Sequence, residues 1–394
     1  MHIVASLTIV LAFLAGLAPP PMALAQDVIK IGATAAITGP ISTLGAAQGK
    51  LWEGWEQAQN EAGGIFVKSL GKRMPIKIIY YDDKSDPKVS VKFYEKLITE
   101  DKVNFLIGPM GSPIGFAATT VAERYKFPML LGPSSDPKIF ERGFKYIQGV
   151  QDLATEWSRH YFDMHANLRK GQTMVLLTED ILFSRGVADG SKRFAAAAGL
   201  KLLSDEVAPA DTADFTPLIT RMKAANPAIV YISSYPPFFV KFAKQAAELG
   251  FNPPALHCPL CSAASVRNSL GPLAELVTGE IFWVPGMKLG DYKMLEAALQ
   301  KSGVDPFQWS FALSSLIQLE VLRAGIEKGG TLDRDVVFNT IKGMEVKTIG
   351  GLWKARPNGA GTITPFPIQI QGGKMVTIWP PEAKTGDYVY PRSR

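Results

Sequence analysis

Short apolar runs alternate with longer amphipathic stretches along most of the chain. An apolar run bounded by Gly and Pro is typical of a buried parallel strand, whereas apolar residues that recur on one helical face predict a helix. The clearest unit occurs twice between Phe105 and Pro137, where an apolar run ends in Gly-Pro, a small hydroxyl cluster follows, and a helix signal begins. Strands and helices that alternate at this spacing predict a parallel sheet with helices on both faces.

The same alternation fills two regions of the chain, which predicts two sheets of similar build. The strands expected in the first region are 28–33, 74–81, 105–107 and 128–131. The pattern restarts near residue 172, with strands expected at 173–178, 201–207 and 228–233 and helices at 184–198, 215–225 and 237–249.

Two later features extend this pattern. A long amphipathic helix is predicted at 308–328, and a β-like tail is predicted at 368–370 and 375–378. The tail has no obvious partner close to it in the chain, so we expect it to return to the earlier sheets.

The composition is that of a globular protein with two domains rather than one. The chain has 394 residues, of which 47% are hydrophobic and 20% are charged, and chains of this length usually divide into domains. The formal net charge is +6, but the charges are interspersed and no block of five Lys or Arg occurs. We therefore expect a solvated basic surface that helps an anionic small molecule to approach, and no nucleic-acid partner.

The N-terminus has the character of an export signal. Residues 3–17 are mostly apolar and uncharged, and the small-x-small pattern Ala23-Leu24-Ala25 follows. This pattern predicts that residues 1–25 are a signal peptide cleaved after Ala25. An uncleaved anchor is the alternative, but the apolar run is short for a membrane span. We therefore expect the mature chain to be exported.

The chain has two cysteines, Cys258 and Cys261. In an oxidising compartment they could form a local disulfide, and free thiols packed in a loop are the alternative. A thioredoxin-like redox site would need the pair at a helix N-terminus, which the surrounding prolines disfavour. Zinc binding is not expected, because His257 is adjacent but no second ligand pair stands at zinc spacing.

Signatures of catalysis are missing from the sequence. No GxGxxG follows the first strand, and Gly359-Ala360-Gly361 fits a surface turn. There is no Walker loop, no GxSxG and no HExxH, and the four His residues are scattered. The pair Asp82-Asp83 fits a turn at a strand end. We therefore expect a binding protein without enzymatic activity, cofactor or metal.

The loops after two predicted strands have the character of an anion site. Ser112 precedes Pro113, which predicts an N-cap and a first helical position, and Ser134 and Ser135 occupy the matching loop of the second unit. Open α/β sheets bind ligands at the carboxyl ends of their strands, and a helix N-terminus attracts anions. These loops therefore predict half of a site for a carboxylate or a similar anion.

Several longer segments are weak signals one by one, but their joint order and spacing form a specific pattern. They are IKIGATAAITGPISTLG, NEAGGI, IIYYDDKSDP, FLIGPMGSPIG, PMLLGPSSDP, DFTPLITRMKAANPAIVYISSY and GGLWKARPNGAG. With them, the chain from Val28 to about Pro380 resembles the periplasmic solute-binding proteins of branched-chain amino-acid ABC importers, the leucine/isoleucine/valine-binding family.

The resemblance implies the type I periplasmic-binding fold. This is an α/β fold of two doubly wound parallel-sheet lobes, joined by three crossovers, with the ligand cleft between them. The implied N-lobe comprises residues 26–149 plus about 284–358. The implied C-lobe comprises residues 150–283 plus about 359–394.

The resemblance also implies ligand-binding positions on both sides of the cleft. The positions that match carboxylate-binding residues of such relatives are Ser112, Ser134 and Ser135. The positions that match other cleft residues are Leu44, Asp152, Phe183 and Tyr235. Helix capping is the alternative role for the serines, and core or interface packing is the alternative for Phe183 and Tyr235.

The chain departs from the amino-acid-binding relatives where they meet the ligand ammonium group. Those relatives carry an acidic residue after the strand near residue 256, but the loop here is HCPLCSAAS, and Leu44 replaces an aromatic residue. An ammonium group buried without a carboxylate is costly. Either Asp152 supplies the charge from another direction, or the ligand is an acid without an amine, aromatic or short aliphatic. We therefore expect leucine and valine to bind weakly.

Two functions fit this picture. The first is the periplasmic substrate-binding subunit of an ABC importer, a monomer that captures a small carboxylate by lobe closure and docks on the membrane permease subunits. The second is a ligand sensor that presents its closed form to a signalling receptor, because one fold supports both uses. An enzyme that uses the two cysteines is a third and weaker hypothesis.

Overall fold

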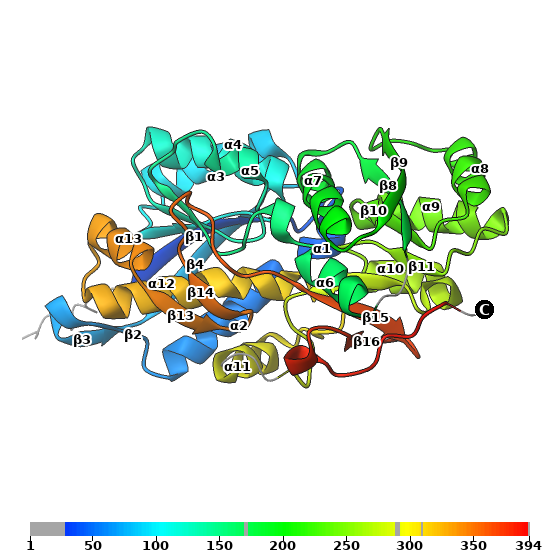
Figure 1. Ribbon diagram of the computed structural model, residues 1–394. Coiled ribbons are helices and arrows are strands. Elements are labelled where there is room, and N and C mark those ends of the chain that lie inside the picture. Colours follow the sequence, from blue (N-terminus) through cyan, green and yellow to red (C-terminus); the bar gives the residue numbers. More distant parts are fainter. Residues whose placement is uncertain (1–27, 169–171, 288–291, 309, 393–394) are drawn as a thin grey trace, which may run out of the picture.

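The computed structural model describes residues 28–168, 172–287, 292–308 and 310–392 (Figure 1). The predicted signal peptide lies outside the described residues. Two separate sheets, each flanked by helices, place the chain in the α/β class, as predicted. In Figure 1 the first sheet lies in the left half of the molecule and the second in the right half. We call the body built on the first sheet the N-lobe and the body built on the second sheet the C-lobe.

The sheet of the N-lobe is parallel throughout, in the order β4-β1-β5-β6-β7. Its strands are β1 Ile29–Ala35, β4 Ile76–Asp82, β5 Phe105–Ile107, β6 Met129–Leu131 and β7 Ile147–Gly149. Its helices are α1 Ser42–Gly45, α2 Gln48–Glu61, α3 Pro87–Thr99, α4 Ser112–Arg124 and α5 Pro137–Phe140. Strands β1, β5 and β6 are almost wholly buried, which explains their unbroken apolar sequences.

The sheet of the C-lobe has the order β16-β15-β12-β11-β10-β8-β9. Its strands are β8 Thr173–Glu179, β9 Lys201–Ala208, β10 Ile229–Ser233, β11 Ala255–His257, β12 Thr278–Ile281, β15 Phe366–Gln371 and β16 Lys374–Thr377. Its helices are α6 Arg159–Leu168, α7 Leu182–Ala197, α8 Thr216–Ala225, α9 Pro236–Glu248 and α10 Ala264–Leu270. The first five strands in chain order are parallel to one another, and β15 and β16 add antiparallel strands at the edge beside β12.

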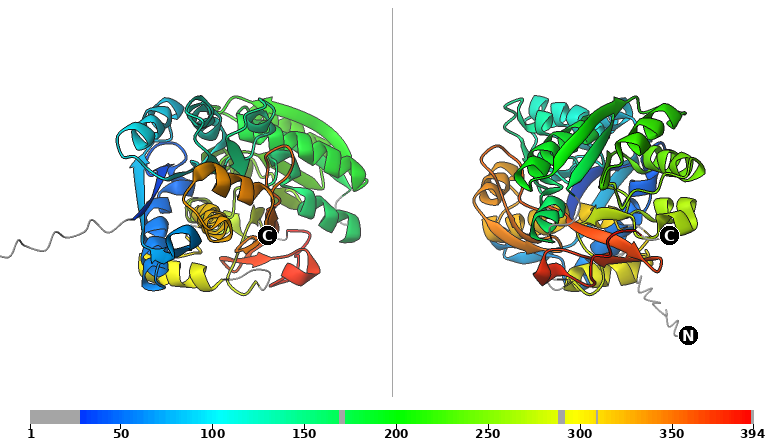
Figure 2. Two further views of the ribbon diagram at one scale, coloured as in Figure 1. Left: turned by 90° about the vertical axis from the view of Figure 1, so that its left-hand side faces the viewer. Right: turned by 45° about the vertical axis from the view of Figure 1, so that its right-hand side comes forward.

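A third group of elements follows the C-lobe strands in the chain but packs on the N-lobe. It comprises α11 Lys293–Ser302, α12 Leu316–Gly329, α13 Arg334–Lys342 and the hairpin β13 Glu345–Thr348 with β14 Gly351–Lys354. Helix α11 lies beside α2 in each view (Figure 1 and Figure 2), and Lys301 Nζ lies 2.6 Å from Glu61 Oε2. In α12, the Gln318 side chain accepts a hydrogen bond from the Gly108 N–H at the end of β5, at 2.8 Å. The residue boundaries of the two lobes stay a prediction.

The described chain passes between the lobes three times, after β7, after β12 and after β14. The first and third connections run side by side. The Gly149 N–H donates to the Gly359 carbonyl at 2.6 Å, and the Gly361 N–H donates to the Gln151 carbonyl at 2.8 Å. Ala360, between the two glycines, is fully buried. The prediction of a surface turn here was wrong, because the segment is covered by its pairing with the other connection.

The predictions for the C-terminal tail and the long helix were confirmed in part. The tail pairs with the earlier sheet as predicted, through β15 beside β12, but β15 and β16 also form a hairpin with each other. The predicted helix at 308–328 begins too early, since a 3-10 turn at Ala312–Ser315 precedes α12. A hairpin of β2 Ile65–Val67 and β3 Lys72–Met74 was not predicted. Of the helices that the structure describes, none is long and apolar enough to cross a membrane.

Candidate functional site

Both sheets reverse their strand order at a point that faces the other lobe. In the N-lobe, β1 is flanked by β4 on one side and β5 on the other, and in the C-lobe β8 is flanked by β9 and β10. Ligands of open α/β sheets bind outside the carboxyl ends of strands at such switch points. The loops at these points are therefore the first place to look for a site.

A small cavity lies between the two switch points. Its wall from the N-lobe and the segment before α12 is formed by Leu44, Met110, Gly111, Pro133, Phe311 and Ser314. Its wall from the C-lobe and the first connection is formed by Gln151, Trp157, Phe183, Tyr235 and Leu260. The cavity volume is about 20 Å³, enough for about one water molecule. A small organic acid can therefore enter only when the lobes separate.

Larger hollows occur elsewhere but have a different character. The groove between α5 and α7 measures about 360 Å³ and is lined by side chains of both charge signs, including Arg185, Asp189 and Lys192. A groove of alternating charges resembles ordinary solvated surface. The apolar cavity at the switch points, which both lobes line, is the better candidate for a ligand site.

The N-terminus of α4 offers hydrogen-bond donors to an anion. Gly111 is the N-cap, so Ser112 is the first helical residue and not the predicted N-cap. Ser112 Oγ accepts hydrogen bonds from the backbone N–H groups of Ser135, at 3.1 Å, and Asp136, at 3.2 Å. These bonds fill both acceptor positions of the hydroxyl, and its own hydrogen stays free to be donated. Together with the dipole of α4, this hydrogen suits a carboxylate.

The other two predicted serines differ from each other. Ser134 Oγ donates to the neighbouring loop between β5 and α4, since it lies 2.9 Å from the Pro109 carbonyl and 3.0 Å from the Gly111 carbonyl. Ser135 Oγ is buried and has no hydrogen-bond partner among the described residues. None of the three serines, Ser112 included, lines the cavity, which is bounded at these loops by Gly111 and Pro133. Ser135 therefore remains available to a ligand that enters between the lobes, whereas the hydrogen of Ser134 is already used.

Tyr235 brings the C-lobe to the same helix terminus. It is the N-cap residue of α9, and its own N–H donates to Glu179 Oε2 at 2.6 Å. Its ring stacks on Phe183 with the centroids 5.8 Å apart. Burial raises the pKa of the Tyr235 phenol well above its ordinary value, and the Ser112 backbone N–H opposes this by a hydrogen bond to the phenol oxygen. The phenol stays protonated, so it too is a donor beside the N-terminus of α4.

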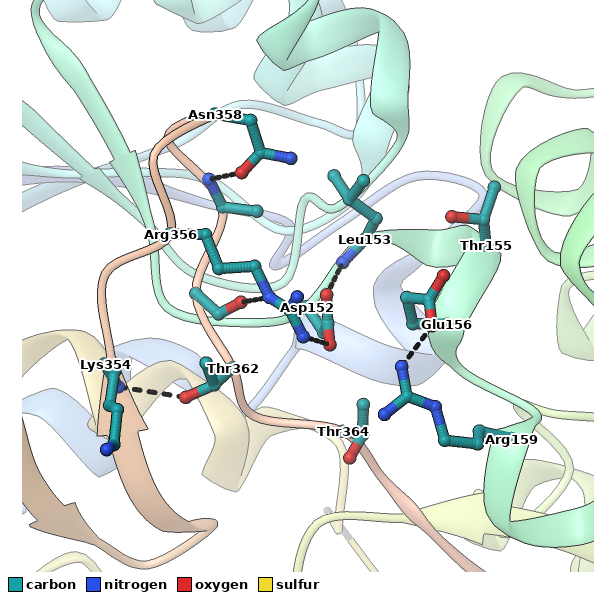
Figure 3. Close-up of polar contacts among 12 residues, drawn as sticks. Asp152, Leu153, Thr155, Glu156, Arg159, Lys354, Arg356, Asn358, Thr362 and Thr364 are labelled. Carbon is teal, nitrogen blue, oxygen red and sulfur yellow. Dashed lines mark hydrogen bonds and ion pairs between the residues drawn. The ribbon is translucent and has the colours of Figure 1, made fainter. Parts of the chain in front are cut away.

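Asp152 is engaged away from the cavity (Figure 3). Its carboxylate pairs with Arg356 and accepts the Leu153 N–H at 2.9 Å. The Arg356 side chain also donates from Nε to the Gly361 carbonyl at 3.0 Å. Burial raises the pKa of the Asp152 carboxyl, while the Leu153 N–H and Arg356 lower it. Asp152 does not line the cavity, so it is not placed to meet a ligand ammonium group there.

Gln151, the residue before Asp152, lines the cavity instead. Successive side chains of an extended segment point to opposite sides, and this segment is extended because Gln151 pairs with Ile363 in a parallel bridge. The family resemblance implied Asp152 as a cleft residue, whereas Gln151 is the one that lines the cavity. The register with Ile363, more than two hundred residues away, decides which of the two residues faces the ligand.

Trp157 was also missed as part of the site, whereas the cysteine loop lies beside the cavity, as expected. The Trp157 ring packs edge-on against Phe183, with the centroids 4.8 Å apart, and its Nε1 has no partner among the described residues. Cys258 and Cys261 form a disulfide, and Leu260 between them contributes to the cavity wall. Of the two alternatives for the cysteines, the structure therefore has the disulfide and not free thiols.

The cavity wall has no charged side chain among the residues described. Buried acids in the C-lobe include Glu179, held by the Tyr235 N–H, and Glu280, beside Ser158, and neither lines the cavity. Burial raises the pKa of Glu179 to about 7, against the lowering effects of the Tyr235 N–H and Lys241. In the described part of the chain, no three His, Cys, Asp or Glu side chains gather as a metal site. The wall therefore suits an apolar body with a few neutral polar groups.

Comparison with known proteins gives a consistent family. A model described as periplasmic binding protein matches residues 28–372. The leucine-, isoleucine-, valine-, threonine- and alanine-binding protein of Pseudomonas aeruginosa is 27% identical over 332 residues, covering 83% of this chain and 86% of that protein.

Solved structures share the fold at low identity. A branched-chain amino acid transporter substrate-binding protein of Streptococcus pneumoniae, in complex with isoleucine, matches with a TM-score of 0.76 at 18% identity, covering 93% of this chain and 100% of that one. An ABC-transporter solute-binding protein of Rhodopseudomonas palustris, in complex with 3,4-dihydroxybenzoic acid, matches with a TM-score of 0.71 at 23% identity, covering 92% and 98%.

Proposed function

The chain belongs to the periplasmic binding protein family, as its sequence predicts, and on that premise we propose that it is the solute-binding subunit of an ABC importer. Its solute in this proposal is a small carboxylate without an amine, such as an aromatic or short aliphatic acid. Residues 1–25 export the chain to the periplasm and are removed there. The monomer then closes its lobes over the solute and docks on the membrane permease subunits.

The observation that best supports this proposal is that hydrogen-bond donors lie at one side of the cavity, whereas its wall has no charged side chain among the described residues. Donors gather at the N-terminus of α4, where the hydroxyl hydrogen of Ser112 is free and the phenol of Tyr235 stays protonated. A carboxylate that accepts several hydrogen bonds from such donors is well stabilised. No charged side chain lines the rest of the described wall, so an ammonium group would be buried there without a counter-charge.

The relatives include proteins that bind amino acids and proteins that bind acids without an amine, and the cavity wall favours an acid without an amine. The Pseudomonas aeruginosa relative is an amino-acid-binding protein, whereas the Rhodopseudomonas palustris structure holds 3,4-dihydroxybenzoic acid. Aromatic side chains at Trp157, Phe183 and Tyr235 provide flat apolar surface for an aromatic body. The disulfide loop provides Leu260 in place of an acid.

Titration calorimetry on the mature chain tests this proposal. The panel is leucine, valine, benzoate, hydroxybenzoates and short aliphatic acids, and the fluorescence of Trp157 in the cavity wall gives a second signal, with Trp157→Phe as its control. We expect at least one amine-free acid to bind at least tenfold more tightly than leucine or valine. Tight leucine binding, with none of the amine-free acids bound, would overturn the proposal.

A cellular experiment separates transport from sensing. Deletion of the gene should abolish uptake of the radiolabelled acid that the purified protein binds. Normal uptake together with a lost transcriptional response to the acid would favour the signalling alternative.

A further inference from the structure

We propose that the side-chain amide of Gln151 binds a second polar group on the ligand, so that the preferred solute is a hydroxylated acid. This inference rests on the proposed function, because it concerns the same cavity. It adds a requirement at the end of the ligand away from the carboxylate, where the solute must carry a neutral group that both donates and accepts a hydrogen bond.

The amide of Gln151 is buried at the cavity with its hydrogen-bonding capacity unused. The residue is 1% exposed and lines the cavity. Neither Oε1 nor Nε2 has a hydrogen-bond partner among the described residues. Its backbone is held firmly, since its carbonyl accepts the Gly361 N–H at 2.8 Å. Buried polar groups are almost always hydrogen-bonded, so an unpartnered amide at a ligand cavity indicates that the ligand supplies the partner.

Gln148 shows what a purely structural glutamine does in the same segment. It is also 1% exposed. Its Nε2 donates to the Gly149 carbonyl at 3.1 Å and to the Ala360 carbonyl at 2.9 Å. The backbone carbonyls of this connection can therefore bond to a buried amide that has a structural role. They do not bond to the side-chain amide of Gln151.

The chemistry of an amide restricts the group it can bind. It presents N–H donors and a carbonyl acceptor side by side. A hydroxyl group matches both, because its oxygen accepts and its hydrogen is donated. A second carboxylate would face the amide oxygen without a hydrogen to share, and an ammonium group would find an acceptor but no negative charge. A hydrocarbon would leave both amide atoms unsatisfied.

Trp157 reinforces the choice of a hydroxyl. Trp157 lines the same cavity, and its indole Nε1 is buried and has no partner in the described part of the chain. The indole N–H can only donate, so it suits the oxygen of a hydroxyl whose hydrogen goes to Gln151 Oε1. The Trp157 ring packs on Phe183, and Phe183 stacks on Tyr235, whose phenol lies beside the N-terminus of α4. A hydroxylated aromatic acid fits this sequence of groups.

The test compares wild type with Gln151→Leu and Gln148→Leu, using benzoate, 3-hydroxybenzoate and 4-hydroxybenzoate in titration calorimetry. Wild type should bind the better hydroxybenzoate roughly ten- to hundredfold more tightly than benzoate, since a lost partner leaves buried polar groups unsatisfied. In Gln151→Leu the preference should vanish, so that the affinities for benzoate and the hydroxybenzoates become similar. In Gln148→Leu the preference should persist.

Thermal unfolding without ligand provides a readout that a structural role would not produce. Gln151→Leu should unfold at the same temperature as wild type or higher, because an unpaired buried amide is removed, whereas Gln148→Leu should unfold at a lower temperature. Gln151→Met is a second apolar variant in case the first does not fold. Equal binding of benzoate and hydroxybenzoates by wild type, or an unchanged preference in both Gln151 variants, would overturn the inference and leave the proposed function intact. No binding of any carboxylate by wild type would overturn both.

Discussion

Replacing Glu280 by Gln should change how the stability of the protein depends on pH. Glu280 lies on β12, is 1% exposed, and has its Oε1 3.6 Å from Nε2 of the buried His257. Burial raises the pKa of Glu280 to about 8, against the lowering effects of the Ser158 hydroxyl and His160. Burial lowers the pKa of His257 well below its ordinary value. At pH 7 both groups are therefore mainly neutral, and they do not form an ion pair.

The direction of the effect follows from proton counting. In the unfolded chain a glutamate ionises near its ordinary pKa of 4.5, whereas folded Glu280 keeps its proton up to about pH 8. Between these values the folded state holds more protons, so stability falls as the pH rises. The pKa difference between 4.5 and about 8 corresponds to about 1.4 kcal/mol per pH unit. The ionisation of Glu280 can therefore lower the free energy of unfolding by at most about 5 kcal/mol. Gln has the shape of the protonated acid and cannot ionise, so this loss should disappear.

Urea unfolding of wild type and Glu280→Gln at pH 5.5 and pH 9 measures the effect. The variant should be more stable by about 1 kcal/mol at pH 5.5 and by up to about 5 kcal/mol at pH 9. The difference between the two proteins cancels the groups remote from Glu280 that titrate alike in both. The exposed Glu382→Gln is the control and should follow wild type at each pH. A difference between wild type and Glu280→Gln that does not grow with pH would refute the reasoning.

Three further changes test contacts around the cavity. Tyr235→Phe removes a donor at the N-terminus of α4 and should weaken carboxylate binding roughly tenfold in calorimetry; unchanged affinity would contradict the role of the phenol. Arg356→Met leaves Asp152 buried without its partner and should lower the free energy of unfolding by about 1–3 kcal/mol. The loss is smaller than for a fully buried pair because the arginine side chain is 38% exposed. An unchanged free energy of unfolding in urea would show that the pair is unimportant for stability. The double variant Cys258→Ser and Cys261→Ser opens a short loop and should lower the free energy of unfolding by only about 2 kcal/mol. It should also weaken solute binding, because the loop forms part of the cavity wall. Unchanged solute affinity would contradict the role of the loop in the site.

The architecture was largely predictable because buried parallel strands leave a strong signal. Strand β5 occupies Phe105–Ile107, as the apolar run indicated, and the tail returns to the C-lobe sheet through β15 Phe366–Gln371. The start of α12 was not predictable from periodicity. Ser314 and Ser315 lie in an apolar stretch, but their hydroxyls bond to the carbonyls of residues 311 and 312, which favours a 3-10 turn over α-helix.

The candidate site was only partly predictable for a similar reason. Leu44, Phe183 and Tyr235 lie on the cavity wall, where the resemblance placed them. The choice of Asp152 over Gln151 depended on a register of one residue, which is set by pairing with a distant segment and leaves no trace in the local sequence. A charged residue is also a more conspicuous candidate than an amide, although only the amide is unpartnered here.

The most direct test is the identity of the solute that the protein carries when it is purified from its own periplasm. The mature protein should be isolated without refolding, denatured, and the released small molecules identified by mass spectrometry. We predict an organic acid that has no amine and carries a hydroxyl group. A branched-chain amino acid, released in an amount equal to the protein, would contradict the central claim.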